Sequence, residues 1–222
     1  LEAAECPPTF GTPPGLVQAI MAGGRAAVFR SREGAEDDAR AARRAVRARV
    51  RRGDIVVGVS ASGVTPFVRG ALAEARGRGA HTVLLACNPT TRRSAGARLL
   101  MTPVPGPEIL TGSTRLKAGT ATKLVLNTLT TATMARLGRV YGNRMVDLQP
   151  RSAKLRERAV RLVQEIARVP RRRARRALDG ARGRVRVAIV MANRGLDAES
   201  AARALRAAGG SLRAALQVSR RT

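Results

Sequence analysis

The sequence contains very few aromatic, histidine and cysteine residues. Of its 222 residues three are Phe, one is Tyr and none is Trp, so the hydrophobic core must be aliphatic. A single histidine, His81, and two widely separated cysteines, Cys6 and Cys87, exclude a Cys/His zinc site, and we expect no metal. No apolar run is long enough to cross a bilayer, so we expect no membrane partner. This composition predicts a cytoplasmic protein in a reduced compartment.

Negative charge is also scarce, because 15 Asp and Glu residues face 42 Lys and Arg residues, for a formal net charge of +27. Such a balance invites a nucleic-acid interpretation. The basic residues are almost all arginines spread along every segment, however, and no aromatic residues are interleaved for base stacking. We therefore expect no nucleic-acid partner, and an arginine-rich binding surface stays open as an alternative. Its densest part would be Arg171, Arg172, Arg173, Arg175 and Arg176.

Apolar runs of strand length alternate with helical patterns, which predicts an α/β fold with a parallel sheet. Strands are expected at residues 55–59, 82–86 and 98–102, and helices at 14–24, 39–52, 67–78, 117–137 and 152–168. Pro170 marks a boundary. The part that follows could form three short helices, at 171–178, 185–192 and 198–207, although residues 185–190 have the β-propensity of a strand.

The first candidate anion site follows the apolar run at residues 55–59. The chain continues there as Ser-Ala-Ser-Gly-Val-Thr-Pro, residues 60–66, and then as a helix. A strand, a Ser/Gly turn and a helix form the geometry that holds a phosphate at the carboxyl end of a sheet. Small hydroxyl side chains donate hydrogen bonds without blocking the approach of the backbone. The sequence therefore predicts a phosphate site at Ser60, Ser62, Gly63 and Thr65.

The second candidate anion site is the segment 106–123, which reads GPEILTGSTRLKAGTATK. Its glycines and proline predict two turns before a helix that begins near Leu116. Ser113 stands about where an N-cap would, with Thr114 and Lys117 close by in the sequence. A helix start with added cations attracts an anion, above all a phosphate. An ordinary capped helix with solvated cations is the alternative.

The sequence motif of this segment, GPE-x-x-x-GSTR-x-KAG-x-x-x-K, resembles the signature shared by N-acetylmuramic acid 6-phosphate etherases and glucokinase regulatory proteins. Both belong to the sugar isomerase (SIS) superfamily. The segments SASGVTP at 60–66, CNP at 87–89 and GRVYGNRMVDLQ at 138–149 extend the resemblance over nearly the whole chain. It implies a flavodoxin-like, three-layer α/β SIS domain with a parallel sheet over residues 1–168. It also implies a small helical bundle at 169–222, ubiquitin-associated-like with three helices, in which residues 185–192 are helical.

Two acidic segments, LEAAECPPTFG at residues 1–11 and EGAEDD at 33–38, stand out in a basic chain. Taken alone, the first is the end of a helix broken by Pro7-Pro8, and the second is a solvated helix start. Both resemble etherase segments that carry the two catalytic carboxylates. The resemblance implies that Glu5 is the proton donor and that Glu36 is the base.

The resemblance implies an etherase that cleaves the lactyl ether of N-acetylmuramic acid 6-phosphate. The products are N-acetylglucosamine 6-phosphate and D-lactate, and the expected role is cell-wall amino-sugar recycling. We expect a phosphorylated amino sugar as substrate, no cofactor, and a homodimer. The alternative is a non-catalytic phosphosugar-binding regulator of the glucokinase-regulator type. Etherases also have an upstream Gly-Thr-Ser-Gly loop, which this sequence lacks, so we expect that an N-terminal portion is missing.

Overall fold

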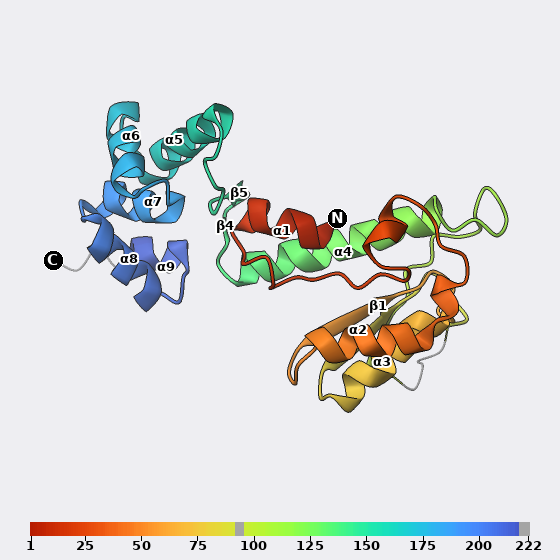
Figure 1. The fold of residues 1–222 in the computed structure, drawn as a ribbon. Coiled ribbons are helices and arrows are strands. Elements are labelled where there is room, and N and C mark those ends of the chain that lie inside the picture. The colour runs from red at the N-terminus through yellow and green to blue at the C-terminus, as the bar shows by residue number, and fades with distance from the viewer. Residues whose placement is uncertain (92–95, 218–222) are drawn as a thin grey trace. The chain divides into compact units, whose positions relative to one another are not determined.

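The structure is a computed structural model that describes residues 1–91 and 96–217 (Figure 1). The chain divides into two compact units. One comprises residues 19–127, and the other comprises residues 1–18 together with 128–222. Among the described helices, none combines the length and the apolar character that crossing a membrane requires.

The unit formed by residues 19–127 is built on a three-stranded parallel sheet. The strands are β1 (Ile55–Val59), β2 (His81–Leu85) and β3 (Leu99–Met101), in the order β1-β2-β3. Ile55 pairs with His81 and Val59 with Leu85, and Val83 pairs with Leu99. The three predicted strands and their parallel arrangement are confirmed. All three run in the same direction, so their carboxyl ends lie at one edge of the sheet.

Helices α2 (Ala39–Arg49) and α3 (Pro66–Gly77) pack against each other beside this sheet. Leu72 of α3 is fully buried with Leu84 of β2, and Val46 of α2 is fully buried with Ala75. Figure 1 shows α2 and α3 on one side of the sheet. Helix α4 (Lys117–Arg136) begins in this unit, which also contains the 3-10 turns η1 (Arg25–Val28) and η2 (Ala35–Asp37).

The predicted helix at residues 14–24 is wrong. The structure has turns and irregular backbone there, and Leu16 and Met21, which the helix would have buried, are 55% and 48% exposed. Gly15, Gly23 and Gly24 lie within or at the end of this short stretch. Glycine loses more conformational entropy in a helix than other residues do. A helical pattern with few buried side chains therefore does not stabilise a helix here.

The other unit contains α1 (Glu2–Phe10), which pairs Cys6 and Phe10 with Met134 of α4 in a small apolar cluster. The helix continues through Pro7 and Pro8, so the predicted break at these prolines is wrong. Proline removes hydrogen bonds from a helix interior. Here the burial of Cys6 and Phe10 one turn apart offsets that cost, and the helix ends at Gly11, which has φ of 62°. A two-stranded antiparallel hairpin, β4 (Val140–Tyr141) and β5 (Arg144–Met145), follows α4.

The largest core cluster of this unit is helical. It joins α5 (Ala153–Ala167), α6 (Arg171–Gly180), α7 (Val185–Arg194), α8 (Ala198–Ala207) and α9 (Leu212–Gln217). Residues 185–194 are helical, as the resemblance implied and against their β-propensity, because Val187, Ile189 and Val190 are all buried within the bundle. The short helix α9 was not predicted. The domain boundary at residues 168/169 stays a prediction.

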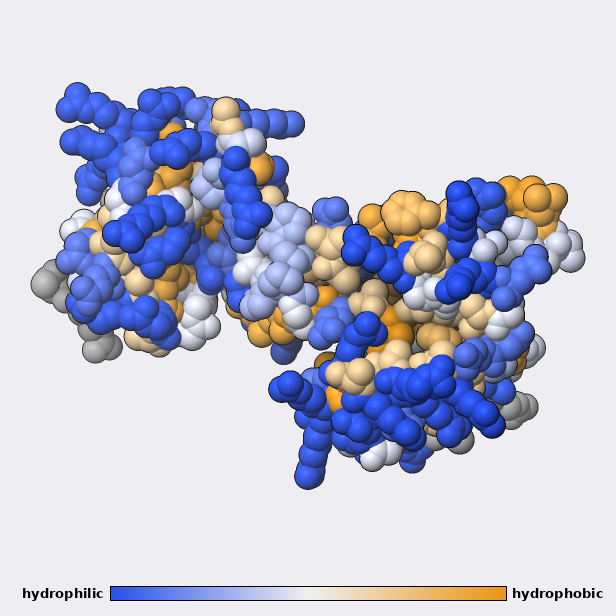
Figure 2. Space-filling model, in the orientation of Figure 1, coloured by the Kyte–Doolittle hydropathy of each residue, from blue (hydrophilic) through white to orange (hydrophobic). Residues whose placement is uncertain are grey.

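The surface is mostly hydrophilic in the view of Figure 2, with an apolar patch over the loop that leads into α4. In the segment before α4, the side chains of Ile109, Leu110 and Leu116 are 73%, 71% and 51% exposed. A contiguous exposed apolar surface commonly marks a site of interaction.

Candidate functional site

Ser60 organises the loop that follows β1. Its side chain is 5% exposed, and its hydroxyl oxygen accepts a hydrogen bond from the N–H of Gly63 at 3.0 Å. The same hydroxyl lies 2.7 Å from the hydroxyl of Thr65, at the other end of the loop. The backbone N–H of Ser60 also donates to Leu85 of β2. Ser60 therefore fixes the shape of the loop, and the hydroxyl of Ser62 is the more exposed of the two serines.

Gly63 allows the loop to turn. Its φ is +76°, and a Cβ at this position would lie 2.5 Å from Cγ2 of Thr91. The hydroxyl of Thr91 in turn donates to the carbonyl oxygen of Ser62 at 3.3 Å. A side chain at position 63 would thus face both an unfavourable backbone conformation and a steric conflict. The loop and the segment after β2 are closely fitted at this point.

Several backbone N–H groups of the loop are left free. Within the described residues, those of Ala61, Ser62 and Thr65 form no hydrogen bond to the chain. Helix α3 begins at the next residue, and the side chain of Thr65 does not cap it. Free donors beside the positive end of a helix form a site for an anion. The loop thus has the donors that a phosphate group requires.

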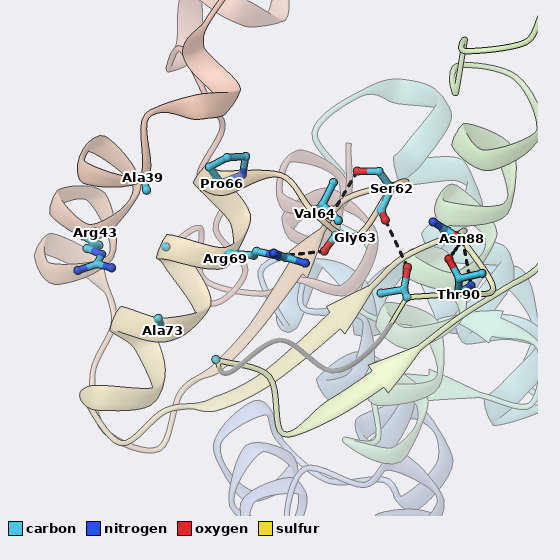
Figure 3. A pocket seen from close by; sticks show the side chains of 13 residues that line it. Ala39, Arg43, Ser62, Gly63, Val64, Pro66, Arg69, Ala73, Asn88 and Thr90 are labelled. Carbon is cyan, nitrogen blue, oxygen red and sulfur yellow. Dashed lines mark hydrogen bonds between the residues drawn. The ribbon is translucent and has the colours of Figure 1, made fainter.

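A cavity of about 830 Å³ opens beside this loop (Figure 3). It is lined by residues of α2, α3, the loop and the segments on either side of the undescribed residues 92–95: Ala39, Arg43, Ser62, Gly63, Val64, Pro66, Arg69, Gly70, Ala73, Asn88, Thr90, Thr91 and Gly96. Arg69 donates through Nε to the carbonyl oxygen of Gly63 at 3.3 Å. Arg43 and Arg69 place positive charge in the lining, which favours an anionic ligand.

Sequence reasoning missed five polar residues of this lining, namely Arg43, Arg69, Asn88, Thr90 and Thr91. Asn88 was part of the quoted CNP turn, where its carboxamide oxygen accepts hydrogen bonds from the N–H and hydroxyl of Thr90. That turn was the only signal available, because the arginines resemble the many others of the chain. Their place in the lining depends on how α2 and α3 pack.

Glu36 lies on the 3-10 turn η2, just before α2, and its side chain is exposed. The neighbouring Asp38 has a structural role, since its carboxylate accepts a hydrogen bond from the N–H of Ala41 at 2.8 Å and caps α2. Of the acidic run, Asp38 therefore fits the interpretation as a helix start. Glu36 belongs to the same unit as the phosphate loop, and η2 packs against α3, the helix that the loop leads into.

The segment 106–116 differs from the prediction at the start of α4. The helix begins at Lys117, and Ser113 is not its N-cap. The carboxylate of Glu108 instead accepts hydrogen bonds from the N–H groups of Lys117 at 3.0 Å and Ala118 at 2.9 Å. The carboxylate of Glu108 thus occupies the position at the helix start where the sequence predicted a bound anion.

Ser113, Thr114 and Lys117 are not among the described residues that line the cavity beside the phosphate loop. They belong to the same unit. The start of α4 contacts the carboxyl end of β2, because the thiol of Cys87 lies 3.6 Å from the carbonyl oxygen of Ala118 and 3.6 Å from the hydroxyl of Thr122. The structure therefore brings Ser60, Ser62, Gly63 and Thr65 together, and sets the other three on a neighbouring segment.

Glu108→Gln is expected to make stability less sensitive to acid. The hydrogen bonds from Ala118 and Lys117 hold the pKa of the Glu108 carboxyl below its ordinary range. A lowered folded-state pKa stabilises the fold above the unfolded pKa of about 4.3 and loses this contribution as the pH falls through the folded value. Thermal unfolding of both proteins between pH 7 and pH 3 measures the difference. Glu33→Gln serves as the control, and an identical pH dependence for Glu108→Gln and wild type would contradict the capping role.

Glu5 belongs to the other unit, on α1, and its side chain is exposed. Glu2, on the same helix, accepts a hydrogen bond from the hydroxyl of Thr130 at 2.6 Å. Burial, and to a smaller extent the charge of Glu2, raise the pKa of the Cys6 thiol. Glu2 and Cys6 thus hold α1 against α4, while Glu5 faces solvent.

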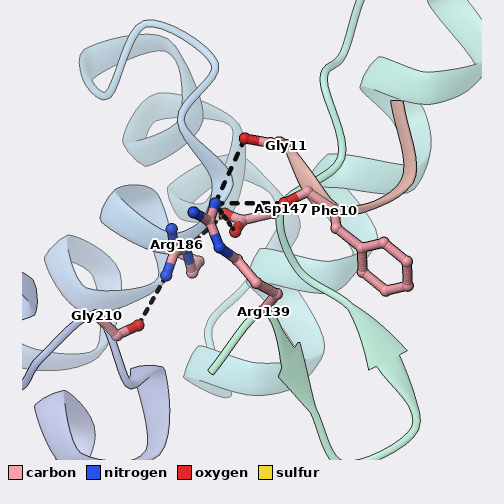
Figure 4. A network of polar contacts seen from close by, with 6 residues as sticks. All are labelled: Phe10, Gly11, Arg139, Asp147, Arg186 and Gly210. Carbon is pink, nitrogen blue, oxygen red and sulfur yellow. Dashed lines mark hydrogen bonds and ion pairs between the residues drawn. The ribbon is translucent and has the colours of Figure 1, made fainter. Parts of the chain in front are cut away.

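The end of α1 is held by a network of polar contacts (Figure 4). Arg139 donates to the carbonyl oxygens of Phe10 at 3.3 Å and Gly11 at 3.4 Å, and pairs with the carboxylate of Asp147 at 3.0 Å. Asp147 also pairs with Arg186 of α7 at 2.5 Å, and Arg186 donates to the carbonyl oxygen of Gly210 at 2.7 Å. This network connects the helix that carries Glu5 to the helical bundle of the same unit.

In the part of the chain that the structure describes, no group of three or more His, Cys, Asp and Glu side chains is arranged to hold a metal ion. Both cysteines are free thiols. The groups that the site offers are therefore hydroxyls, backbone N–H groups, guanidinium groups and carboxylates.

The family model of the glucokinase regulatory protein N-terminal SIS domain matches residues 9–76. This range includes η2, α2, β1, the phosphate loop and most of α3.

Comparison with curated proteins gives matches over nearly the whole chain. An N-acetylmuramic acid 6-phosphate etherase of Symbiobacterium thermophilum is 53% identical over 190 residues, which are 86% of this chain and 63% of the relative. The relative of the same name from Rubrobacter xylanophilus is 51% identical over 222 residues, 100% of this chain and 73% of the relative. A third, from Nostoc sp., is 49% identical over 217 residues, 97% of this chain and 71% of the relative.

Proposed function

Because this chain belongs to the N-acetylmuramic acid 6-phosphate etherase family, we propose that it cleaves the lactyl ether of N-acetylmuramic acid 6-phosphate. The products would be N-acetylglucosamine 6-phosphate and D-lactate, and the activity is that of a carbon–oxygen lyase. The observation that carries the proposal is the phosphate loop, in which the Ser60 hydroxyl fixes the backbone and leaves free N–H groups beside the start of α3.

In this proposal the loop holds the phosphate of the substrate. Ser62 and the free N–H groups of Ala61, Ser62 and Thr65 would donate to the phosphate oxygens, and Arg43 and Arg69 would supply countercharge. Ser60 positions the loop, and Gly63 allows its turn. Binding of the phosphate fixes where the sugar carbons lie, which is the source of much of the rate gain in such reactions.

The reaction requires a base and an acid. Once the sugar ring has opened, the proton on C2 is next to the aldehyde carbonyl, and Glu36 takes it. The electron pair forms the C2–C3 double bond, the C3–oxygen bond breaks, and Glu5 gives a proton to the departing lactate oxygen. Water then adds across the double bond, with hydroxyl at C3 and a proton at C2. The exposed side chains of Glu5 and Glu36 are accessible to a substrate, which supports these roles.

Ser113, Thr114 and Lys117 complete the proposed substrate site. Ser113 and Thr114 precede α4 in the segment that Glu108 holds against the helix start, and the hydroxyl and ammonium groups of the three residues suit sugar and phosphate oxygens. The helical part of the chain, residues 169–222, is proposed as a separate domain. Helices α6 to α9 of this part share one apolar core, to which α5, before the proposed boundary, also contributes.

The setting of the reaction is also part of the proposal. We place it in the cytoplasm, in recycling of cell-wall amino sugars, because both thiols are free and the expected substrate is a phosphorylated amino sugar. We further propose a homodimer. The exposed Ile109, Leu110 and Leu116 support it, since association would cover this apolar patch.

A phosphosugar-binding regulator of the glucokinase-regulator type is the second candidate. The match of residues 9–76 to the glucokinase regulatory protein SIS domain supports this second candidate. That match covers the phosphate loop, which a sensor and an enzyme would share. Identity of 46% to 53% with etherases over most of the chain favours the enzyme.

Incubation with N-acetylmuramic acid 6-phosphate tests the function. We expect release of D-lactate, and in D₂O containing labelled oxygen we expect deuterium at C2 and the labelled oxygen at C3 of the product. Elimination followed by addition of water requires deuterium at C2, whereas direct displacement of lactate by water at C3 would place the labelled oxygen there without deuterium at C2. Saturable binding of the phosphosugar without lactate would favour the regulator. Absence of both binding and lactate release would overturn the proposed function.

A further inference from the structure

A second large cavity lies within the unit that contains the helical bundle, and its lining is strongly cationic. It has a volume of about 920 Å³ and includes residues from the end of α1, from 139–151, from the turn before α7, and from α8 and the turn after it. Its charged lining residues are Asp147 and six arginines: Arg139, Arg151, Arg182, Arg184, Arg186 and Arg206. A concave surface lined by one sign of charge concentrates its field and attracts ions of the opposite sign.

The one carboxylate among these lining residues forms ion pairs with two of the arginines. Asp147 pairs with Arg139 and with Arg186, as Figure 4 shows. In the described residues, the guanidinium groups of Arg151, Arg182 and Arg206 pair with no carboxylate, and all three side chains are exposed at this cavity. Three cations therefore remain without a fixed partner around one hollow.

The backbone adds further donors to the same cavity. Helix α7 begins at Val185, ten residues long, and no side chain caps its start. Val185, Arg186 and Val187, the residues of its first turn, all line the cavity. In the turn before α7, Arg182 and Gly183 have left-handed φ values of 52° and 77°. These values turn the chain sharply into the helix. The positive end of the helix thus adds to the charge of the arginines.

We propose that this cavity binds a small, multiply charged anion of the phosphate class, such as pyrophosphate or a phosphate monoester. Arginine is suited to this role because its planar guanidinium forms paired, charge-assisted hydrogen bonds to phosphate oxygens. A concave site of this size admits a small molecule. A nucleic-acid backbone would instead meet an extended basic face, such as that of α6, where Arg172 and Arg176 are exposed. The site uses none of the residues of the phosphate loop.

Calorimetric titration of the full chain with pyrophosphate tests the proposal. Arg182→Asn/Arg206→Gln removes two cavity cations, and asparagine tolerates the left-handed backbone at position 182. The matched control, Arg172→Gln/Arg176→Gln, removes the same charge from α6, outside the described lining. We expect the cavity variant to bind roughly tenfold or more weakly, since it loses charge-assisted hydrogen bonds, and the control to bind within about twofold of wild type. Circular dichroism checks that both variants are folded.

Four results would overturn the proposal. The wild type would show no saturable binding of pyrophosphate, or both double variants would weaken it equally, which would indicate general attraction to a basic surface. A loss of binding in Gly63→Ala but not in Arg182→Asn/Arg206→Gln would assign the anion to the phosphate loop. Tight binding of a short oligonucleotide that depends on Arg172 and Arg176, with none of pyrophosphate, would indicate a nucleic-acid surface.

Discussion

Glu36→Gln is expected to lower the rate of D-lactate release by about 10²–10⁴-fold, the usual contribution of a general base. Glutamine keeps the size of the side chain and cannot accept the C2 proton. Glu36 is exposed on η2 and holds no helix cap, unlike Asp38, so the fold and the binding of the phosphosugar should be retained. Lactate release, binding of the phosphosugar and C2 exchange with D₂O are measured together.

Glu5→Gln provides a second test of the same mechanism, because acid and base act on different bonds. Without Glu36, C2 exchange and lactate release should fall together. Without Glu5, the C2 proton should still exchange while lactate release falls, since only the departing oxygen lacks its proton. Glu33→Gln, another exposed carboxylate of the same acidic run, is the control and should keep both activities. Unchanged turnover in Glu36→Gln would remove it from the mechanism.

Gly63→Ala should sharply weaken phosphosugar binding and lower the free energy of unfolding. A left-handed φ of +76° costs a residue with a Cβ about 1–3 kcal/mol. The new methyl group would also lie 2.5 Å from Cγ2 of Thr91, and overpacking of this kind costs about 1–3 kcal/mol more. Since Thr91 donates to the carbonyl oxygen of Ser62, displacing it would move the loop that presents the N–H donors. Chemical denaturation and phosphosugar titration measure the two effects.

Two variants separate the backbone cost from the steric cost. Gly53 has φ of +88°, and nothing lies within 4 Å of a Cβ built there, so Gly53→Ala bears only the backbone cost. It should destabilise the chain less than Gly63→Ala and leave binding intact. Adding Thr91→Ala to Gly63→Ala removes the two nearest atoms, Cγ2 and Oγ1, and should recover most of the steric part. Equal losses in Gly53→Ala and Gly63→Ala, without rescue, would show that the fit to Thr91 does not matter.

Local patterns predicted the strands and the strand–turn–helix geometry of residues 55–77 well, for a physical reason. The run at residues 55–59 is short and rich in β-branched residues, which favour a strand over a helix, and pairing with β2 satisfies its backbone. The Ser/Gly turn after it allows few other conformations, because Gly63 must be left-handed. The resemblance then supplied a helix at residues 185–192, which the structure extends to Arg194 and for which β-propensity indicated the wrong structure.

Other features depended on contacts between residues far apart in the sequence. The continuation of α1 through Pro7-Pro8 rests on Met134, more than a hundred residues away. Glu108, rather than Ser113, meets the start of α4 because the loop folds back over nine residues. The apolar side chains at residues 14–24 have too little surface to pack against, and the predicted helix does not form there.

By itself the sequence determined the strand–turn–helix loop, the alternation of strands with helices and the family, since these depend on residues adjacent in the chain. Only the tertiary structure decided which charges meet. It surrounded Asp147 with Arg139 and Arg186, left Arg151, Arg182 and Arg206 around one cavity, and set Arg43 and Arg69 beside the phosphate loop. In a chain with 42 basic residues, spacing does not distinguish a solvated arginine from one that lines a site. That distinction arises from the packing of the helices that carry them.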